Sequence, residues 1–263
     1  LVYTNTSVTP IGRLAAFLEG LPHIWHIREF GDLDFGFRPI YPRWLINWII
    51  TSSAAVICHA NSVRKYHFPY NRKNIHLVYN GCATREQFDK LLDTRRSIPT
   101  HPVFTFAMLS GLSPRKGQAQ AIRVLAALNS KGLQARLVLA GGGRQDFTDS
   151  LKTLAVDLGV KDLVEFIGLV SDPYPVYFSA DCVLICSEHE AFSRAGLEAM
   201  STALPLIARN SGGSPELMEN GKTGILYDAE DELVSAMTRM IQYPTEARQM
   251  GLAGWNRARE HFN

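Results

Sequence analysis

The sequence has few cysteines and almost no net charge, and each of these shortages argues against one class of protein. Its 263 residues include only four cysteines, and no two of them have the two-residue spacing of a zinc or redox motif. We therefore expect reduced thiols and a cytoplasmic location rather than a disulfide-stapled secreted scaffold. The 27 Lys and Arg residues against 25 Asp and Glu residues give a net charge of +2. That balance is too even to indicate a nucleic-acid-binding protein.

Long apolar runs and complete cofactor motifs are also missing. The most apolar stretch, residues 44–60, is interrupted by polar residues and falls short of the ~20 apolar residues that span a membrane. The glycines at 141–143 lack the third glycine of a dinucleotide-binding fingerprint, and GKT at 221–223 lacks the first glycine of a P-loop. His189-Glu190 has no second histidine at the spacing of a helical zinc-protease motif. We therefore expect no metal and no cofactor.

What the sequence does contain is an alternation of short apolar runs with longer amphipathic runs. From about Phe104 onward the spacing is typical of βαβ units and predicts parallel strands joined by helical crossovers in a doubly wound α/β layer. The helix predicted over 118–132 has its apolar residues on one face and ends at Gly132. The strands predicted in this half are 104–109, 135–140, 164–168, 181–186, 205–208 and 224–227.

The first hundred residues show the same rhythm in a shorter form. The charged stretch 81–101 suits a connection between two lobes. Strands are expected over 2–5, 23–27, 55–60 and 75–80, with helices over 10–20 and 43–51. The predicted domains are a partial amino-terminal Rossmann-like lobe with its linker (1–100), a carboxy-terminal Rossmann-like lobe (101–244) and a helical tail (245–263).

Two cationic residues stand at the start of the helix predicted over 118–132. Arg115 and Lys116 lie near the positive end of the helix dipole, where each is unfavourable by up to ~1 kcal/mol unless an anion is present. Free amides, a dipole and two cations together make a phosphate-binding site. The alternative is a pair of solvated surface residues.

A second constellation, residues 187–200, follows the buried strand predicted over 181–186. Glu190 lies in the turn after this strand, and Glu198 follows eight residues later. Two helical turns would separate the two carboxylates by roughly 12 Å, which exceeds the spacing of paired glycosidase acids. We interpret them as two groups that bind different parts of a long polar ligand, with the amides of residues 192–195 free to hold an anion. The alternative is two solvated glutamates.

These residues resemble the group 1 family of retaining, nucleotide-sugar-dependent glycosyltransferases, which have the GT-B fold. The matching motifs occur in the family's order over nearly the whole chain. They are TNTSV (4–8), PHIWHIREF (22–30), VYNG (78–81), LSPRKGQ (112–118), the glycines at 141–143, VEFIGLVSD (164–172), EAFSRAGLE (190–198) and SGGSPELMENGKTGILYD (211–228).

The resemblance implies a GT-B fold of two Rossmann-like lobes with parallel sheets. The donor site would lie in the second lobe, and the acceptor site would be formed mainly by the first. The family's amino-terminal lobe normally opens with further βα units, so the resemblance implies a truncated first lobe. Such a lobe would leave an exposed sheet edge within residues 1–80, through which the chain could dimerise.

The resemblance also implies roles for individual residues. Glu190 takes the place of the glutamate that hydrogen-bonds the donor sugar, and Glu198 that of the glutamate that holds the nucleotide ribose. Lys116 matches the lysine that neutralises the donor diphosphate. His26 best matches a catalytic histidine that approaches the sugar, with a packed strand histidine as an equal alternative. The further candidates for substrate binding are Arg115, Phe192, Ser193, Arg194 and Gly142.

The match departs from the family pattern at three places. At Gly111 the family usually has an arginine, so we expect either that Arg115 substitutes for it or that the contact with the diphosphate is weaker. Ser193 stands where many members have glycine, and Ala203-Leu204 replaces a common glycine-containing turn.

The activity implied by the resemblance is transfer of a glycosyl group from a nucleoside diphosphate sugar, with retention at the anomeric carbon and without a metal. The acceptor would be a carbohydrate or a lipid-linked sugar in cell-envelope polysaccharide or glycolipid synthesis. Two alternatives stay open: a nucleotide-binding module without turnover, and a GT-B-fold epimerase that acts on a nucleotide sugar.

One segment bears on a membrane partner. Residues 37–48 (FRPIYPRWLINW) interleave two arginines with aromatic residues, a pattern suited to peripheral contact with the inner face of a membrane. The alternative is a helix that packs its tryptophans in the core of the lobe.

Overall fold

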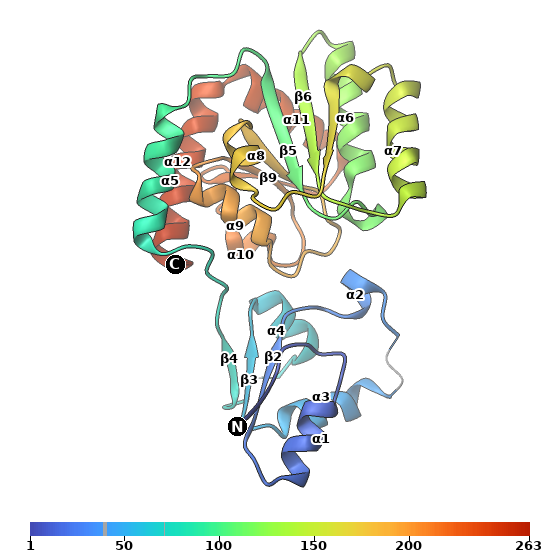
Figure 1. Cartoon of the computed structure of the whole chain (residues 1–263), viewed down its shortest axis with the longest axis vertical. Coiled ribbons are helices and arrows are strands. Elements are labelled where there is room, and N and C mark those ends of the chain that lie inside the picture. The colour runs from blue at the N-terminus through green and yellow to red at the C-terminus, as the bar shows by residue number, and fades with distance from the viewer. Residues whose placement is uncertain (39–40, 71) are drawn as a thin grey trace. The chain divides into compact units, whose positions relative to one another are not determined.

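The computed structural model describes residues 1–38, 41–70 and 72–263, and their contacts form two compact units (Figure 1). The smaller unit comprises Leu1–Asn80 together with His189–Phe192. The larger unit comprises Gly81–Glu188 and Ser193–Asn263. Pro39 and Ile40, which belong to the basic and aromatic segment 37–48, lie outside the described residues.

The smaller unit is built on a parallel four-stranded sheet of order β1-β2-β3-β4. In β2, His23, Trp25 and Ile27 are buried and alternate with half-buried residues, as expected for a strand with one face in the core. Within the described residues, β1 and β4 each pair with one strand, so both are edges of this sheet. The elements are β1 (Val2–Thr4), α1 (Ile11–Leu18), β2 (His23–Ile27), α2 (Asp32–Phe35), α3 (Arg43–Thr51), β3 (Ala55–Cys58), α4 (Asn61–His67) and β4 (Ile75–Leu77).

The larger unit is built on a parallel six-stranded sheet of order β10-β9-β8-β5-β6-β7, covered by helices (Figure 1). Its buried apolar cluster includes Phe106, Leu137 and Leu184 from three neighbouring strands. The elements are α5 (Arg85–Ser97), β5 (Phe104–Leu109), η1 (Pro114–Lys116), α6 (Gln118–Ser130), β6 (Ala135–Ala140), α7 (Gln145–Asp157), η2 (Lys161–Leu163), β7 (Val164–Gly168), α8 (Tyr174–Phe178), β8 (Cys182–Ile185), α9 (Arg194–Ser201), β9 (Leu206–Arg209), α10 (Ser214–Leu217), β10 (Gly224–Tyr227), α11 (Glu230–Gln242) and α12 (Pro244–His261).

Residues 81–101, expected to connect two lobes, instead contain helix α5 and belong to the larger unit. The Thr84 hydroxyl accepts a hydrogen bond from the Gln87 amide, and the Gln87 side chain accepts one from the Thr84 amide. This reciprocal cap starts the helix despite its polar composition. Phe88 is fully buried, and its carbonyl accepts a hydrogen bond from Trp255 Nε1 at 3.0 Å. Helix α5 thus packs beside α12, so the expected tail is also part of the larger unit (Figure 1).

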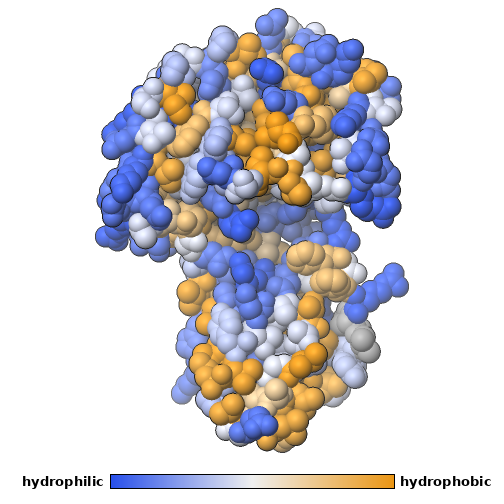
Figure 2. Space-filling model, in the orientation of Figure 1, coloured by the Kyte–Doolittle hydropathy of each residue, from blue (hydrophilic) through white to orange (hydrophobic). Residues whose placement is uncertain are grey.

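Apolar side chains gather on the surface of the smaller unit (Figure 2). On α3, Trp44 and Trp48 are 70% and 63% exposed. The alternative that this helix packs its tryptophans in the core is therefore wrong. On α1, Ile11, Phe17 and Leu18 are likewise exposed. Across the described residues, none of the helices combines the length and the apolar character needed to cross a bilayer.

All four cysteines are free thiols. Burial is the main cause that raises the pKa of both Cys58 and Cys82 to about 12. Cys182 and Cys186 are buried in and directly after β8. Because the thiolate is the reactive form, these side chains are packing groups at neutral pH.

Candidate active site

The order in which the strands are added to the larger sheet reverses at β5. This strand pairs with β6 on one side and with β8 on the other. In open α/β sheets, ligands bind beyond the carboxyl ends of the strands at such a switch point. The loops after β5, β6 and β8 are therefore the candidate site in this unit, and they carry the basic and acidic motifs identified in the sequence.

Close backbone contacts join the loop after β5 to the loop after β6. The Leu112 amide donates to the Gly142 carbonyl at 2.8 Å. On the other side, the Gly141 amide donates at 2.7 Å to the carbonyl of Gly168, the last residue of β7. Gly141 has a φ of 144°, and a Cβ there would lie 2.0 Å from the Ser110 carbonyl oxygen. Glycine is required here because two backbones approach each other. Gly142, a predicted binding residue, lies half-buried in the resulting wall.

The two predicted phosphate-binding cations lie in η1, directly before α6. Arg115 is exposed and Lys116 is half-buried. Gly117 follows with a φ of 75°, and a Cβ there would lie 2.5 Å from the Cβ of Cys186. The Arg115 carbonyl accepts a hydrogen bond from the Glu188 amide at 3.2 Å. These contacts fasten the basic turn after β5 to the turn after β8.

Gln118, the first residue of α6, is a candidate that the sequence reasoning missed. Its side chain is buried, and Nε2 donates to the Ser110 hydroxyl and to the Gly111 carbonyl, each at 3.1 Å. Within the described part of the chain, its Oε1 atom is buried without a hydrogen-bond partner. An amide is thus locked beside the basic turn. The one sequence signal that could have indicated Gln118 is its position directly after Gly117.

The second predicted motif forms the turn after β8 and the start of α9. The Oγ atom of buried Ser193 accepts a hydrogen bond from the Gly196 amide at 3.0 Å, which caps the helix. Because α9 begins at Arg194, Glu190 lies outside the helix. The expected helical spacing between Glu190 and Glu198 therefore does not apply.

Glu198 is held in place by its neighbours on α8 and α9. The Tyr177 hydroxyl lies 2.9 Å from Glu198 Oε2 and 3.1 Å from the Ala195 carbonyl. Arg194 Nε lies 3.4 Å from Glu198 Oε1, and the Arg194 side chain is otherwise 83% exposed. Burial, followed by the neighbouring Glu198 charge, raises the pKa of Tyr177, so the hydroxyl keeps its proton. The carboxylate is oriented by these contacts before any ligand arrives.

In the smaller unit, His26 lies within β2 rather than after it. Its Nδ1 atom is 2.6 Å from the Tyr3 hydroxyl on β1. Its Nε2 atom is buried and has no partner among the residues that the structure describes. Burial and the Arg28 charge lower the pKa of His26, while Glu29 opposes them. The imidazole is therefore neutral at pH 7.

Glu29 is a second residue that the sequence reasoning missed. Its buried carboxylate accepts hydrogen bonds from the Thr6 hydroxyl at 2.6 Å and from the Ser7 amide at 2.5 Å. It thereby ties the TNTS loop after β1 to the end of β2. Arg28, exposed at the carboxyl end of β2, lies next to it. No local sequence signal pairs two segments this far apart along the chain.

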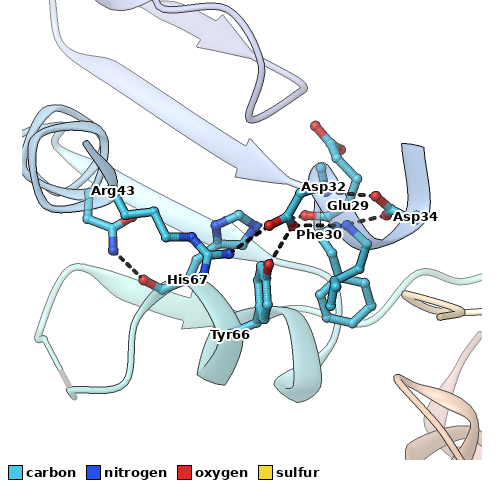
Figure 3. Close-up of polar contacts among 10 residues, drawn as sticks. Glu29, Phe30, Asp32, Asp34, Arg43, Tyr66 and His67 are labelled. Atoms are coloured by element: carbon cyan, nitrogen blue, oxygen red, sulfur yellow. Dashed lines mark hydrogen bonds and ion pairs between the residues drawn. The ribbon is translucent and has the colours of Figure 1, made fainter. Parts of the chain in front are cut away.

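A polar network holds the segment after β2 (Figure 3). The Asp34 carboxylate accepts a hydrogen bond from the Phe30 amide at 2.8 Å, and burial raises the pKa of Asp34. Asp32 accepts a hydrogen bond from the Tyr66 hydroxyl and pairs with Arg43 at 3.3 Å. The Arg43 guanidinium also lies 4.3 Å from the centre of the Tyr66 ring. This end of the sheet thus carries a connected set of polar side chains.

Phe192, a predicted binding residue, has a buried ring in the smaller unit. Its ring centre lies 5.4 Å from that of Tyr79 and 6.1 Å from that of His59. Burial is the main cause that lowers the pKa of His59 to about 4. The phenyl ring is therefore a packing group, and a binding role would rest on its backbone. Glu190, in the same segment, is half-buried.

Metal ligands do not gather in the described ranges: no group of three or more His, Cys, Asp or Glu side chains is placed to hold an ion.

Comparison with known proteins decides the family. The model of the family described as "Glycosyl transferases group 1" matches residues 93–257. The chain belongs to the group 1 glycosyltransferases. Its two parallel sheets are those of the GT-B fold, as expected from the sequence.

Among group 1 relatives, the GDP-mannose-dependent alpha-(1-6)-phosphatidylinositol monomannoside mannosyltransferase of Mycobacterium tuberculosis is 33% identical over 161 residues. That match covers 57% of this chain and 41% of the relative, so the chain spans less than half the length of this relative. The alpha-maltose-1-phosphate synthase of Mycolicibacterium smegmatis is 25% identical over 302 residues, covering 100% of this chain and 75% of the relative.

Solved structures show the same GT-B fold. The crystal structure of Anabaena HepE in complex with UDP and glucose has a TM-score of 0.84 and 22% identity, covering 99% of this chain and 73% of that one. Sucrose-phosphate synthase from Thermosynechococcus elongatus has a TM-score of 0.79 and 18% identity, covering 99% of this chain and 69% of that one.

Proposed function

We propose that the chain transfers a glycosyl group from a nucleoside diphosphate sugar to an acceptor, with retention at the anomeric carbon. The observation that carries the proposal is the hydrogen bond from the Glu188 amide to the Arg115 carbonyl. It brings the basic turn and the start of the acidic motif to one edge of the larger sheet. Relatives whose names include GDP-mannose, and a neighbour solved with UDP and glucose, support a nucleotide-sugar donor.

Charge on the departing diphosphate is the main problem in this chemistry. As the glycosidic bond lengthens, negative charge grows on the phosphate oxygens, and Lys116, Arg115 and the first amides of α9 stabilise it. Such preorganised electrostatic contacts commonly lower a barrier by ~3–4 kcal/mol each. We propose that these groups act without a metal ion or a cofactor.

The two glutamates would hold the donor at its two ends. Glu190 accepts hydrogen bonds from the sugar hydroxyls, and Glu198 accepts them from the ribose. Glu198 suits this role because Tyr177 and Arg194 already fix its carboxylate. Gly142, Ser193 and the backbone of residue 192 complete the donor contacts in this proposal.

The smaller unit would bind the acceptor, a carbohydrate or a lipid-linked sugar. His26 would approach the transferred sugar as a neutral imidazole, which accepts or donates a hydrogen bond without adding charge. We further propose peripheral contact of this unit with a membrane, supported by the exposed Trp44 and Trp48.

The test uses paired variants of the intact protein. Glu190→Gln and Lys116→Gln should each lower sugar transfer by about a hundredfold. The first removes the charged acceptor of the sugar hydroxyls, and the second removes a cation that stabilises the departing diphosphate. Glu188→Gln, in the same turn as Glu190, and Lys131→Gln, at the far end of α6, are the matched controls. Both controls should keep near-normal turnover.

The readout is product formation from GDP- and UDP-sugars, followed by chromatography. Near-normal turnover in Glu190→Gln or Lys116→Gln contradicts the assigned roles. Conversion of the nucleotide sugar without an acceptor indicates an epimerase instead. Nucleotide binding by calorimetry without product, over a panel of acceptors, indicates a binding module.

A further inference from the structure

A second pocket lies in the larger unit, at the opposite edge of the sheet from the candidate active site. It has a volume of about 600 Å³ and is lined at the amino ends of β5 and β8 by residues such as Phe104 and Asp181. The loop between α5 and β5 forms one wall. The start of α12 forms another, through Pro244 and Arg248. In a parallel sheet these strand starts cannot belong to the site at the carboxyl ends.

The lining of this pocket carries more positive than negative charge. Arg95, Arg96 and Arg248 contribute three guanidinium groups, and His101 adds a further nitrogen donor. Asp181 is the one carboxylate in the lining. Arg96 pairs at 3.5 Å with Asp93, which lies on the exposed side of α5. Arg95 and Arg248 therefore face a single acidic group.

That acidic group is already engaged. His101 Nδ1 lies 3.0 Å from Asp181 Oδ1, and the Thr105 amide donates to Oδ2 at 2.9 Å. Arg95 Nη2 is 4.0 Å from Oδ1, at the outer limit of an ion pair. Across residues 1–38, 41–70 and 72–263, Arg248 makes no ion pair. Asp181 thus balances only part of the positive charge.

The surroundings of Arg95 disfavour its charged form. Its side chain is only 18% exposed, and its Nη1 donates to the Phe178 carbonyl at 3.2 Å, so it cannot move freely into water. Burial lowers the pKa of Arg95; Asp181 opposes this, and Arg248 adds repulsion. A half-buried and an exposed guanidinium that line one pocket and repel each other favour an anion there.

Four prolines restrict the backbone around the rim of the pocket. Pro99, Pro102, Pro205 and Pro244 all line it, and each fixes its own backbone φ angle. A pocket that keeps its shape without ligand spends less free energy on ordering when a ligand binds.

We propose that this pocket binds the phosphate group of a small phosphorylated molecule, at a site separate from the transferase site. Arg95 and Arg248 provide planar donor forks of the kind that hold phosphate oxygens in pairs. The pocket volume far exceeds that of a bare phosphate and falls in the range of small-molecule sites, so it has room for an attached sugar or nucleoside. Apolar lining residues, including Leu92 and Leu252, would contact the carbon skeleton. A site for such a ligand, distant from the catalytic loops, would let a metabolite change the stability or activity of the donor-binding unit.

The experiment measures hydrogen exchange of the intact protein with and without glucose 6-phosphate and inorganic pyrophosphate at millimolar concentrations. We expect slower exchange in peptides covering 92–104 and 244–252 with at least one probe. In the Arg248→Gln variant, the apparent affinity for the probe that gives this protection should fall at least tenfold. Arg248 is exposed, so the variant should fold, and an unchanged melting temperature checks that it does.

The matched control is Arg136→Gln on β6, which makes the same charge change at an exposed arginine outside the pocket. It should bind both probes as the unchanged protein does. An equal loss of binding in both variants would show a non-specific charge effect and overturn the proposal. No protection with either probe, or protection confined to 110–118 and 187–196, would overturn it as well.

Discussion

Replacing Ala203 by glycine should stabilise the protein, although it removes a methyl group. Ala203 has a φ of 57°, and it is the one non-glycine residue with a positive φ in the described ranges. It ends α9: the Leu204 amide donates to the Ala199 carbonyl at 3.1 Å, and the Ala203 amide donates to the Met200 carbonyl at 3.0 Å. This pair of hydrogen bonds is the Schellman ending, whose left-handed position is usually glycine.

The magnitude follows from two opposing terms. A side chain in the left-handed region costs about 1–2 kcal/mol, which glycine does not incur. Glycine also raises the conformational entropy of the unfolded chain, which lowers the free energy of unfolding by about 0.5–1 kcal/mol. The net expectation for Ala203→Gly is a stabilisation of about 0.5–1 kcal/mol, or roughly 2 °C in melting temperature for a unit of this size.

Thermal unfolding by calorimetry or circular dichroism measures the change. The matched control is Ala253→Gly, inside α12, where glycine should cost about 1 kcal/mol because the position is helical. The two alanine-to-glycine changes should therefore have opposite signs. A melting temperature that falls in Ala203→Gly as far as in Ala253→Gly would refute the reasoning.

Three further predictions concern other parts of the fold. Gly251→Ala should destabilise the protein by about 2–3 kcal/mol, because its Cβ would lie 2.1 Å from the Ala203 carbonyl oxygen. Gly254→Ala, three residues later with its nearest atom at 3.5 Å, should be neutral or stabilising, and equal melting temperatures for the two variants would contradict this. Because the pKa of buried His59 falls from 6.5 to about 4 on folding, the unfolded chain takes up the proton first. About 3 kcal/mol of stability, complete above pH 6.5, should be lost as the pH falls to about 4. Hydrogen exchange in residues 1–80 should then depend less steeply on pH in His59→Gln, and an unchanged slope would exclude this role. Finally, Trp44→Ser combined with Trp48→Ser should abolish sedimentation with anionic vesicles at low salt, and an unchanged bound fraction would remove the membrane contact.

The strand pattern could be predicted closely from the sequence. The strands over 23–27, 104–109, 135–140, 164–168 and 224–227 match the structure at both ends, because each is a short apolar run bounded by polar or turn residues. Helix α5 could not be predicted from its average polarity. It depends on a capping box and on two buried residues, Phe88 and Leu92, spaced one turn apart.

The motifs of the candidate site could be located in the sequence, but not the contacts that orient them. Tyr177 reaches Glu198, and Glu29 reaches Ser7, across separations that only the folded chain closes. The helical spacing assumed between the two motif glutamates was wrong because Ser193 starts α9 late. Patterns of residue type show which loop carries chemistry, and tertiary hydrogen bonds decide where its side chains point.

The link between the turns after β5 and β8 is made by main-chain atoms alone, from the Glu188 amide to the Arg115 carbonyl. Any residue other than proline at position 188, and any residue at position 115, can form it. Substitution of side chains in either turn therefore leaves this alignment unchanged. The side chains of these two loops can thus be varied one at a time while the backbone that carries them keeps its place.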